Sequence, residues 1–520
     1  MSSDGVRLPE PGQPALPPDR FAWCGDAVAY WAERQPDSVA LADPLYRLTY
    51  VELEAIRWAW AEALKEAGLA PGDRLLILCE NCCATAVATL AAQALRAWAI
   101  PLNARLSARE VATIAEHSGA RLVITTDALS PPAAAHGADL GAREQAPFFT
   151  LGAKIAQGPA PQPPEPVESD PTRQVAAMIY TTGTTGAPKG VMLSHDNLMF
   201  IAGRSSATRW LTPADHVYAV LPISHVFGLA SVLQGTLYQG GRLMLAPRFD
   251  GEAVLKAFAE EGISIFQGVP QMYARLAGLI EATGGAVEAP RLRYLSSGGA
   301  PLAAELKERI EGLLGLALHN GYGLTETSPT VSTTPTEARC PDTSTGPLLP
   351  DVAVKIVTPQ GKEAAPDEVG EIWVKGRLIM RGYYHDPAAT AAVVTEEGWF
   401  TSGDLGRLDA RGYLWVVGRL KELIIRSGFN VYPPEVEAVL TGHPDIALAA
   451  VLGAKQADGN EEVVAFLQPR PGRTPDLAAV KAYAAERLAP YKRPGRYEVL
   501  AELPAAATGK LLKHKLKDRL

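Results

Sequence analysis

The stretch YTTGTTGAPKG at residues 180–190 combines hydroxyl side chains, glycines and one lysine. Glycine lets backbone N–H groups approach an anion closely, threonine adds hydroxyl donors, and Lys189 adds a mobile positive charge. This composition predicts a loop that holds phosphate groups. The spacing differs from the common phosphate loop, in which Gly-Lys precedes Ser or Thr, because Lys189 follows Pro188 and precedes Gly190. A plain surface turn would explain the glycines and the proline, but not the threonines ahead of a lysine.

The segments around this loop indicate how the chain positions it. An apolar run precedes the loop, and a second apolar run after it leads into a helix start at Ser194 or His195. Elsewhere short aliphatic runs alternate with longer helical patterns, which is typical of parallel sheets covered by helices. The predicted strands are RLLILCE, RLVITTD, HVYAVLP, GRLMLAP, SIFQGVP and LRYLSSGG. We therefore predict an α/β fold class.

Changes in composition divide the chain into segments. Residues 1–20 are rich in Pro and Gly and lack an apolar core, so we expect a loose tail and no signal peptide. Residues 130–172 are rich in Ala, Pro and Gly and are expected to connect two α/β regions. Short strands with turn signals at 340–418 predict a small antiparallel sheet or barrel. We place a large domain at 21–420 and a small one at 421–520.

The charge distribution supports that boundary. The last hundred residues contain 15 Lys+Arg and 12 Asp+Glu, a net charge of +3. The preceding 420 residues have a net charge of −11, which gives −8 for the whole chain. An acidic chain disfavours nucleic acid as a partner. The length of 520 residues and the 47% hydrophobic content predict a globular protein of two or more domains. A homodimer is one assembly that stays open at this stage.

The cysteines and the apolar segments bear on the compartment. Five cysteines, with Cys79 and Cys82 in a CxxC spacing, form neither a disulfide framework nor a full zinc ligand set. We favour a buried strand end running into a helix over a redox or metal pair. The apolar run at 82–95 is too short to span a membrane and ends at Arg96, so it is expected to be a core helix. A cytoplasmic location is expected.

The loop at 180–190 resembles the signature loop of the adenylate-forming superfamily, which includes acyl- and aryl-CoA synthetases, luciferases and the adenylation domains of peptide synthetases. Later segments resemble further motifs of that family in the same order. They are LSSGGAP at 295–301, NGYGLTETSP at 320–329, TSGDLG at 401–406, GRLKELIIRSGFNVYPPEVE at 418–437 and PAAATGKLLK at 504–513. The resemblance implies a large N-terminal domain of two α/β subdomains plus a distorted β-barrel, followed by a small mobile α+β C-terminal domain.

The resemblance also implies a reaction in two halves. A carboxylate attacks the α-phosphorus of ATP to give an acyl-adenylate and pyrophosphate, and the thiol of coenzyme A then displaces AMP. Mg²⁺ is the implied cofactor, and ATP and coenzyme A are the implied co-substrates. The residues implied to bind ATP are Thr181, Thr182, Gly183, Thr184, Thr185, Gly186, Lys189, Gly298, Gly299, Ala300, Tyr322, Asp404 and Arg419.

Within this set the roles differ. The loop residues are expected to hold the β- and γ-phosphates, Tyr322 to stack on adenine beside the glycines at 298–299, and Asp404 with Arg419 to contact the ribose. By the same resemblance Thr325 would contact the α-phosphate and Glu326 would anchor Mg²⁺, for which a hard carboxylate oxygen is suited.

Catalysis and domain motion are assigned to other positions. Lys510 is expected to bridge the substrate carboxylate and the α-phosphate, and His225 to position the acyl carboxylate or to gate the thiol. The resemblance places a hinge at Lys421. It also places Ser427, Gly428 and Phe429 on the coenzyme A tunnel after the small domain rotates. The basic run KLLKHKLKDRL, which includes neighbours of Lys510, could alternatively form a membrane-surface helix.

The predicted acyl pocket is formed by LPISHVFGLASVLQGTLYQGG, FQGVPQMY and GYGLTETSP, which are mostly apolar or small. No Arg or Lys between His225 and Gly241 could pair with a second carboxylate, so we expect a hydrophobic monocarboxylic acid, first a medium- or long-chain fatty acid and alternatively an aryl acid. No acidic residue between Pro222 and Arg248 could hold an amino group, and the chain ends soon after the lysine motif, which disfavours a peptide-synthetase module. A non-catalytic nucleotide-binding homologue is disfavoured by the intact motifs.

Overall fold

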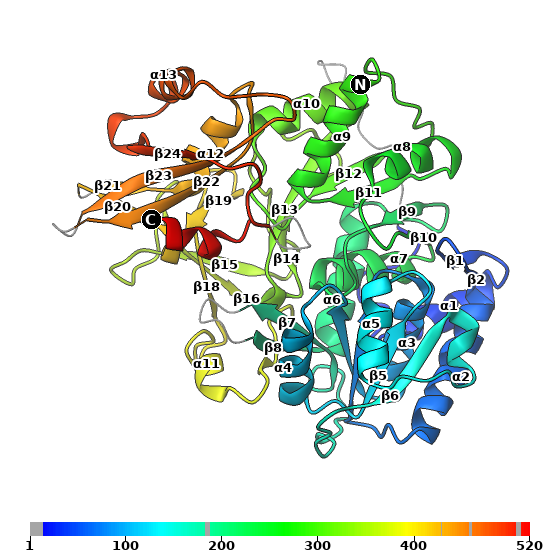
Figure 1. The fold of residues 1–520 in the computed structure, drawn as a ribbon. Coiled ribbons are helices and arrows are strands. Elements are labelled where there is room, and N and C mark those ends of the chain that lie inside the picture. The colour runs from blue at the N-terminus through cyan, green and yellow to red at the C-terminus, as the bar shows by residue number, and fades with distance from the viewer. Residues whose placement is uncertain (1–13, 183–187, 428, 457–459, 506–510) are drawn as a thin grey trace.

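The computed structural model describes residues 14–182, 188–427, 429–456, 460–505 and 511–520. The chain forms a large N-terminal domain and a small C-terminal domain, which lie side by side in Figure 1. The large domain contains two extended sheets with helices against them and a third, smaller sheet. The predicted α/β class is thereby confirmed.

The first extended sheet has seven strands in the order β17-β8-β7-β4-β3-β5-β6. Its centre, β7-β4-β3-β5, is parallel, and its outer strands β6, β8 and β17 run antiparallel to their neighbours. The strands are β3 (Arg74–Cys79), β4 (Trp98–Asn103), β5 (Leu122–Thr126), β6 (Ala153–Gln157), β7 (Val175–Thr182), β8 (Pro188–Ser194) and β17 (Gly382–Tyr383).

The second extended sheet has eight strands in the order β14-β13-β12-β11-β9-β10-β1-β2. All of its pairings are parallel except those of β2 and β14, the two edge strands. The strands are β1 (Val39–Ala42), β2 (Arg47–Thr49), β9 (His216–Ala219), β10 (Arg242–Leu245), β11 (Ile265–Gly268), β12 (Tyr294–Ser297), β13 (Leu318–Gly323) and β14 (Thr330–Thr333). Each strand predicted from an aliphatic run is present in one of these two sheets.

The core of the large domain includes two helices that are buried along most of their length. In α3 every residue from Cys83 to Gln93 is buried, and in α6 every residue from His195 to Ser206. The helices of the large domain up to residue 314 are α1 (Asp26–Arg34), α2 (Tyr50–Glu66), α3 (Cys83–Ala94), α4 (Ala108–Ser118), α5 (Pro131–Asp139), α6 (His195–Thr208), α7 (Gly235–Tyr238), α8 (Gly251–Glu260), α9 (Pro270–Ala282) and α10 (Ala304–Leu314). The mostly apolar α3 needs such a surrounding, whereas α6 also buries polar and charged side chains, including Asp196 and Arg204.

The cysteine-rich stretch lies at the junction of β3 and α3, and all five cysteines are buried. The interpretation as a buried strand end followed by a core helix is therefore confirmed. Helix α6 begins at the predicted place, because the Ser194 hydroxyl accepts the backbone N–H of Asn197 and caps the first turn. Within the described part of the chain, no helix is both long and apolar enough to cross a membrane.

The third sheet of the large domain is antiparallel, in the order β15-β16-β18-β19, as the turn-rich segment predicted. Its strands are β15 (Ala353–Val357), β16 (Gly370–Lys375), β18 (Phe400–Leu408) and β19 (Leu414–Arg419), and α11 (Pro387–Ala391) lies between β17 and β18 in the chain. In its described residues the small domain contains a hairpin, a three-stranded sheet and two α-helices. They are β20 (Ile424–Arg426), β21 (Phe429–Val431), α12 (Pro433–Thr441), β22 (Ile446–Lys455), β23 (Glu461–Pro469), α13 (Leu477–Arg487) and β24 (Arg496–Val499).

Two expectations need correction. Part of the expected loose tail is packed: the backbone of Leu16 exchanges hydrogen bonds with the Gln239 side chain, and Tyr238 bonds to the backbone of Pro17 and Arg20. The expected connection at 130–172 contains helix α5 and edge strand β6. There the Ser130 hydroxyl caps a proline-started, alanine-rich turn, and alanine is the strongest helix former.

The basic run at the C-terminus is a short 3-10 helix, η6 (Lys513–Arg519), rather than an amphipathic membrane helix. Its Leu516 is buried in a cluster with Phe466 of β23 and Leu503. The apolar side of this segment is therefore already used within the small domain.

Candidate active site

Loops at the carboxyl ends of β11, β12 and β13 converge, as ligand-binding loops do in open parallel sheets. Residues 298–300 follow β12, and Gly298 donates its N–H to the carbonyl of Gly268, the last residue of β11. A Cβ atom on Gly298 would lie 3.0 Å from the Phe227 ring, and Gly299 has a φ of +77°. The positive φ favours glycine at position 299, and Gly299 and Ala300, unlike Gly298, are not buried.

Tyr322, Asp404 and Arg419 form one hydrogen-bonded cluster. The Tyr322 hydroxyl donates to Asp404 Oδ2 at 2.8 Å, and Arg419 Nε lies 2.9 Å from Asp404 Oδ1. Asp404 and Arg419 are also paired in register across β18 and β19, while Tyr322 comes from β13. Burial, with the Asp404 charge, raises the pKa of Tyr322 well above its ordinary value, so the phenol stays a donor.

A second cluster joins Lys189, Tyr383 and Glu326. The Tyr383 hydroxyl donates to Glu326 Oε1 at 2.8 Å, and Lys189 Nζ lies 4.6 Å from the centre of the Tyr383 ring. Lys189 is on β8, which pairs with β17 carrying Tyr383, and Glu326 is in the 3-10 helix η3 (Thr325–Thr327). Thr325 beside it is buried. Burial raises the pKa of Tyr383, and the Glu326 charge adds to the effect.

His225 stands at a tight turn before the π-helix η2 (Phe227–Gln234). Its N–H donates to the Pro222 carbonyl at 2.9 Å, and its Nδ1 accepts the N–H of Phe227 at 3.3 Å. A Cβ atom on Gly228 would lie 2.1 Å from the Pro222 oxygen, so only glycine fits there. π-Helical turns are uncommon and frequent at functional sites. The backbone N–H of Phe227, two residues on, thus helps to orient the His225 ring.

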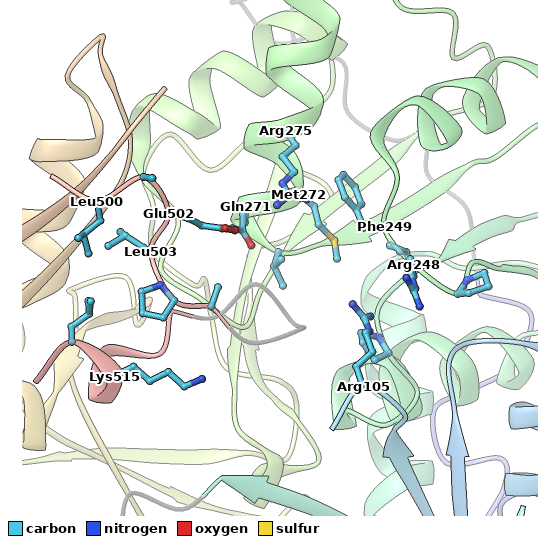
Figure 2. A pocket seen from close by; sticks show the side chains of 18 of the residues that line it. Arg105, Arg248, Phe249, Gln271, Met272, Arg275, Leu500, Glu502, Leu503 and Lys515 are labelled. Atoms are coloured by element: carbon cyan, nitrogen blue, oxygen red, sulfur yellow. The ribbon is translucent and has the colours of Figure 1, made fainter. Parts of the chain in front are cut away.

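A cavity of about 860 Å³ lies between the two domains, next to this turn. Figure 2 shows side chains of the large domain, including Phe249 and Met272, on one side and Leu500, Leu503 and Lys515 on the other. Pro222, three residues before His225, is part of the wall. The apolar part of the wall is formed by Val220, Pro222, Phe249, Val269, Met272, Leu500, Leu503 and Leu516.

The same cavity has a basic rim that the sequence patterns did not indicate. Arg105 and Arg248 both pair with the buried Glu80 carboxylate, each with its Nε 3.0 Å from Oε1. Their side chains remain 36% and 51% exposed, so they can also meet a ligand. Arg275, Lys515 and Arg519 add further positive charge to the lining. The rim therefore favours an anion.

Two predicted residues lie at the end of β7, and several others lie outside the described residues. Thr181 and Thr182 end β7, where Thr181 is in register with Lys189, but Gly183, Thr184, Thr185 and Gly186 lie outside the described residues. Lys510 and Gly428 also lie outside them.

The structure does not bring the predicted coenzyme A loop to the cavity. Phe429 is 55% exposed and stacks on Tyr491, and the Ser427 N–H donates to Asn460 Oδ1 within the small domain. Lys421 is exposed in the 3-10 helix η4 (Leu420–Glu422), directly after β19.

Sequence reasoning missed four residues of the clusters and of the cavity rim, which are Tyr383, Glu80, Arg105 and Arg248. Tyr383 sits in GYYHD, where an aromatic pair has the pattern of ordinary core packing. Glu80 precedes Arg248 by 168 positions, so no local spacing could connect them. A charged residue at the end of a buried strand, as in LLILCE, was the one available signal.

Comparison with known proteins places the chain in a family. Residues 28–384 match the family model described as AMP-binding enzyme, and residues 435–510 match that of the AMP-binding enzyme C-terminal domain. A feruloyl-CoA synthase of Amycolatopsis is 35% identical over 94% of this chain and 97% of its own length. A long-chain-fatty-acid–CoA ligase of Bacillus subtilis is 31% identical over 94% and 92%.

A solved structure agrees with these relatives. It is that of O-succinylbenzoate coenzyme A synthetase from Bacillus subtilis in complex with ATP and magnesium ion, with a TM-score of 0.80 and 31% identity. The match covers 95% of this chain and 99% of that one. The likeness extends over both domains described above.

Proposed function

The chain belongs to the AMP-binding enzyme family and is an AMP-forming acid–thiol ligase, and on this premise we propose that it activates a hydrophobic monocarboxylic acid and transfers it to coenzyme A. A medium- or long-chain fatty acid is the first candidate. The observation that carries the proposal is the apolar wall of the interdomain cavity, which begins at Pro222 beside the His225 turn.

ATP is proposed to lie across the two hydrogen-bonded clusters. Asp404, which bonds to Tyr322 and Arg419, is proposed to accept the ribose hydroxyls, because an ionised carboxylate accepts about four hydrogen bonds. Lys189 and the loop before it are proposed to hold the departing pyrophosphate, where preset positive charge lowers the barrier. Lys510 is proposed to meet the attacking carboxylate, and Thr325 the α-phosphate.

Mg²⁺ is proposed to accompany ATP. In the described residues no group of three or more His, Cys, Asp or Glu is placed to hold a metal ion. This fits Mg²⁺, which usually binds proteins through one or two carboxylates together with substrate phosphates. Glu326 is the carboxylate present, and Tyr383 holds its orientation through the 2.8 Å hydrogen bond. When bound, the ion would neutralise phosphate charge.

The thiol substrate is proposed to approach through the same cavity. Coenzyme A is a polyanion with a long, flexible pantetheine arm, and the basic rim with the apolar wall behind it suits both parts. For this half-reaction the small domain, proposed as 421–520, would rotate about Lys421 relative to the large domain at 21–420. Ser427, Gly428 and Phe429 would then face the cavity, which would account for the position of Ser427 and Phe429 away from it in this arrangement.

An aryl acid is the second candidate. The feruloyl-CoA synthase among the relatives acts on an aromatic acid, as its name states, and matches this chain at least as well as the fatty-acid ligase does. Both candidates share the mechanism and differ in pocket depth alone.

A coupled assay distinguishes them. The purified protein is incubated with ATP, Mg²⁺, coenzyme A and one acid at a time from C2 to C18 fatty acids and substituted benzoates and cinnamates, and AMP and pyrophosphate are measured. We expect release of both with C8 to C18 acids. A preference for aryl acids by kcat/KM would replace the fatty-acid assignment, and no acid-dependent release with any compound would refute the proposed function.

A further inference from the structure

The described residues on both sides of the segment 506–510 are held on the small domain. Before it, Leu503 is buried and its N–H donates to Gln468 Oε1 at 2.8 Å. After it, the Leu512 N–H donates to the Pro504 carbonyl at 2.7 Å, and Leu511 bridges to Ala505. These contacts bring Ala505 and Leu511, the residues on either side of 506–510, together as a base on the small domain.

Lys513 adds a charged anchor to this base. Its Nζ lies 2.8 Å from Glu422 Oε2 and 2.8 Å from Glu437 Oε1, and its side chain is 15% exposed. Glu437 Oε1 also accepts the N–H of Val451 on β22 at 2.7 Å. Because the pair with Glu437 is largely withdrawn from water, its attraction is screened less than that of a surface pair.

The two carboxylates, Glu422 and Glu437, lie on different segments of the chain. Glu422 ends η4 and directly follows Lys421, the proposed hinge residue, whereas Glu437 lies on α12 in the body of the small domain. Lys513 therefore ties three parts together: the hinge turn, α12 and the base of the lysine segment. A rotation about the hinge would carry the base along as one piece with α12.

We propose that Lys513 is a positioning residue for the adenylation half-reaction, setting where the segment with Lys510 stands relative to the hinge. The inference rests on the proposed function, in which Lys510, three residues earlier in the chain, meets the reacting carboxylate. Positioning matters at this level because a misplacement of 1 Å at a reacting group can reduce the rate about 100-fold. The transfer of a preformed acyl-adenylate to coenzyme A does not need Lys510 and should not need Lys513.

The test separates the two halves in the full chain. Lys513→Met keeps the length of the side chain and removes its charge, Lys513→Arg keeps the charge, and Lys517→Met is the control, because Lys517 is an exposed lysine of the same segment. Acid-dependent pyrophosphate formation and coenzyme A transfer from supplied acyl-adenylate are measured for each. We expect Lys513→Met to lose at least tenfold in the first and less than twofold in the second. Lys513→Arg should recover most of the loss, and Lys517→Met should match the wild type.

Two results would overturn the inference. An equal fall of both halves in Lys513→Met would show general damage to the domain, and an unchanged adenylation rate would show that the anchor is dispensable. Hydrogen exchange gives a readout without activity: the Leu512 amide should exchange at least tenfold faster in Lys513→Met, with the amides of β22 and β23 unchanged. Wild-type protein that forms no pyrophosphate with any acid refutes the proposed function, whereas an active wild type with an equally active Lys513→Met refutes this inference alone.

Discussion

At the scale of single residues, the site is organised by tyrosines that hold carboxylates in place. Tyr322 bonds to Asp404 and Tyr383 to Glu326, each at 2.8 Å, and both phenols are buried enough to remain protonated. A buried donor fixes the orientation of an acceptor at little entropic cost when the ligand arrives. The carboxylates are therefore set before nucleotide binds.

The first prediction concerns Lys510. Lys510→Ala should reduce acid-dependent pyrophosphate formation by about 100- to 1,000-fold, the size typical for loss of one preset group that stabilises transition-state charge. Coenzyme A transfer from supplied acyl-adenylate should remain within about threefold, because Lys510 is proposed to act in the other half. Rapid-quench measurement of each half checks this. Loss of both to the same degree would contradict the assigned role.

The second prediction concerns Tyr383. Tyr383→Phe removes the hydroxyl bonded to Glu326 but keeps the ring beneath Lys189. A hydrogen bond to a charged group contributes about 1.5–3 kcal/mol, so kcat/KM for ATP should fall about tenfold or more, with KM for the acid unchanged. Steady-state kinetics at saturating Mg²⁺ measures the change. Kinetics equal to the wild type would show that Glu326 is oriented by other contacts.

At the scale of elements, the π-helix η2 determines where His225 lies. Its first turn approaches the 221–222 backbone so closely that a Cβ atom on Gly228 would meet the Leu221 oxygen at 2.5 Å and the Pro222 oxygen at 2.1 Å. Later in the same stretch the packing relaxes, since a Cβ on Gly235 would have its nearest neighbours at 3.6 Å. An added side chain is therefore tolerated at Gly235 but not at Gly228.

The third prediction uses this contrast. Gly228→Ala forces backbone to move, which in a packed core costs typically about 1–3 kcal/mol or more, and it displaces the His225 turn. We expect a lower melting temperature and at least tenfold lower adenylation. Gly235→Ala should stay close to the wild type in both, because its new methyl group makes ordinary contacts. If both variants behave alike, the tight turn is not what positions His225.

At the scale of the whole molecule, the interdomain cavity brings together parts that are distant in the chain. Arg105 follows β4 of the seven-stranded sheet, Arg248 follows β10 of the eight-stranded sheet, and both share Glu80 after β3. The small domain closes the opposite side with Leu500 and Lys515 (Figure 2). The proposed substrate route therefore depends on how the sheets and domains pack.

The fourth prediction tests the basic rim. Arg248→Gln keeps a polar side chain but removes a charge that can face a phosphate, so KM for coenzyme A should rise about tenfold, the equivalent of about 1.4 kcal/mol. KM for ATP should not change, since Arg248 lies outside both clusters that are proposed to bind ATP. Arg109→Gln on α4 is the matched control, because Arg109 is exposed and is not among the cavity-lining residues. An unchanged KM for coenzyme A would exclude Arg248 from the thiol route.

The fifth prediction concerns stability in acid. Burial, with Arg96 nearby, lowers the pKa of His195 to about 3, and its Nδ1 accepts the Cys24 N–H. An unfolded histidine has a pKa near 6.5, so below that pH the unfolded chain binds a proton that the folded chain does not. The free energy of unfolding should therefore fall by about 1.4 kcal/mol per pH unit below pH 6 for this residue, down to about pH 3.

Chemical denaturation between pH 4.5 and 7.5 measures that slope. His195→Asn should be less stable at neutral pH, because it alters a buried site at the start of α6, but its stability should depend less on pH below 6. A slope equal to that of the wild type would show that other groups account for the acid sensitivity. Burial also lowers the pKa of His319 to about 3 and that of His216 to about 4, so part of the slope should remain.

Much of the fold follows from local patterns. The aliphatic runs of β3 and β9–β12 and the start of α6 at Ser194 are short-range signals, because burial on both sides of a parallel strand and the capping of a first turn need few neighbours. The connection at 130–172 was misjudged, since its alanines favour a helix and its prolines suggest a loop. Tertiary packing settles such conflicts.

The sequence by itself determined the class of chemistry, because the Thr-Glu pair at 325–326, Asp404 and the Gly-Lys at 509–510 follow one another in the order of a known family. The tertiary structure alone decided which groups hold these residues. Tyr383 meets Glu326 across 57 positions, Lys513 meets Glu422 across 91, and Arg248 meets Glu80 across 168. Chain spacing encodes periodicity and turns over a few residues, whereas such pairs form when distant parts of the chain pack together.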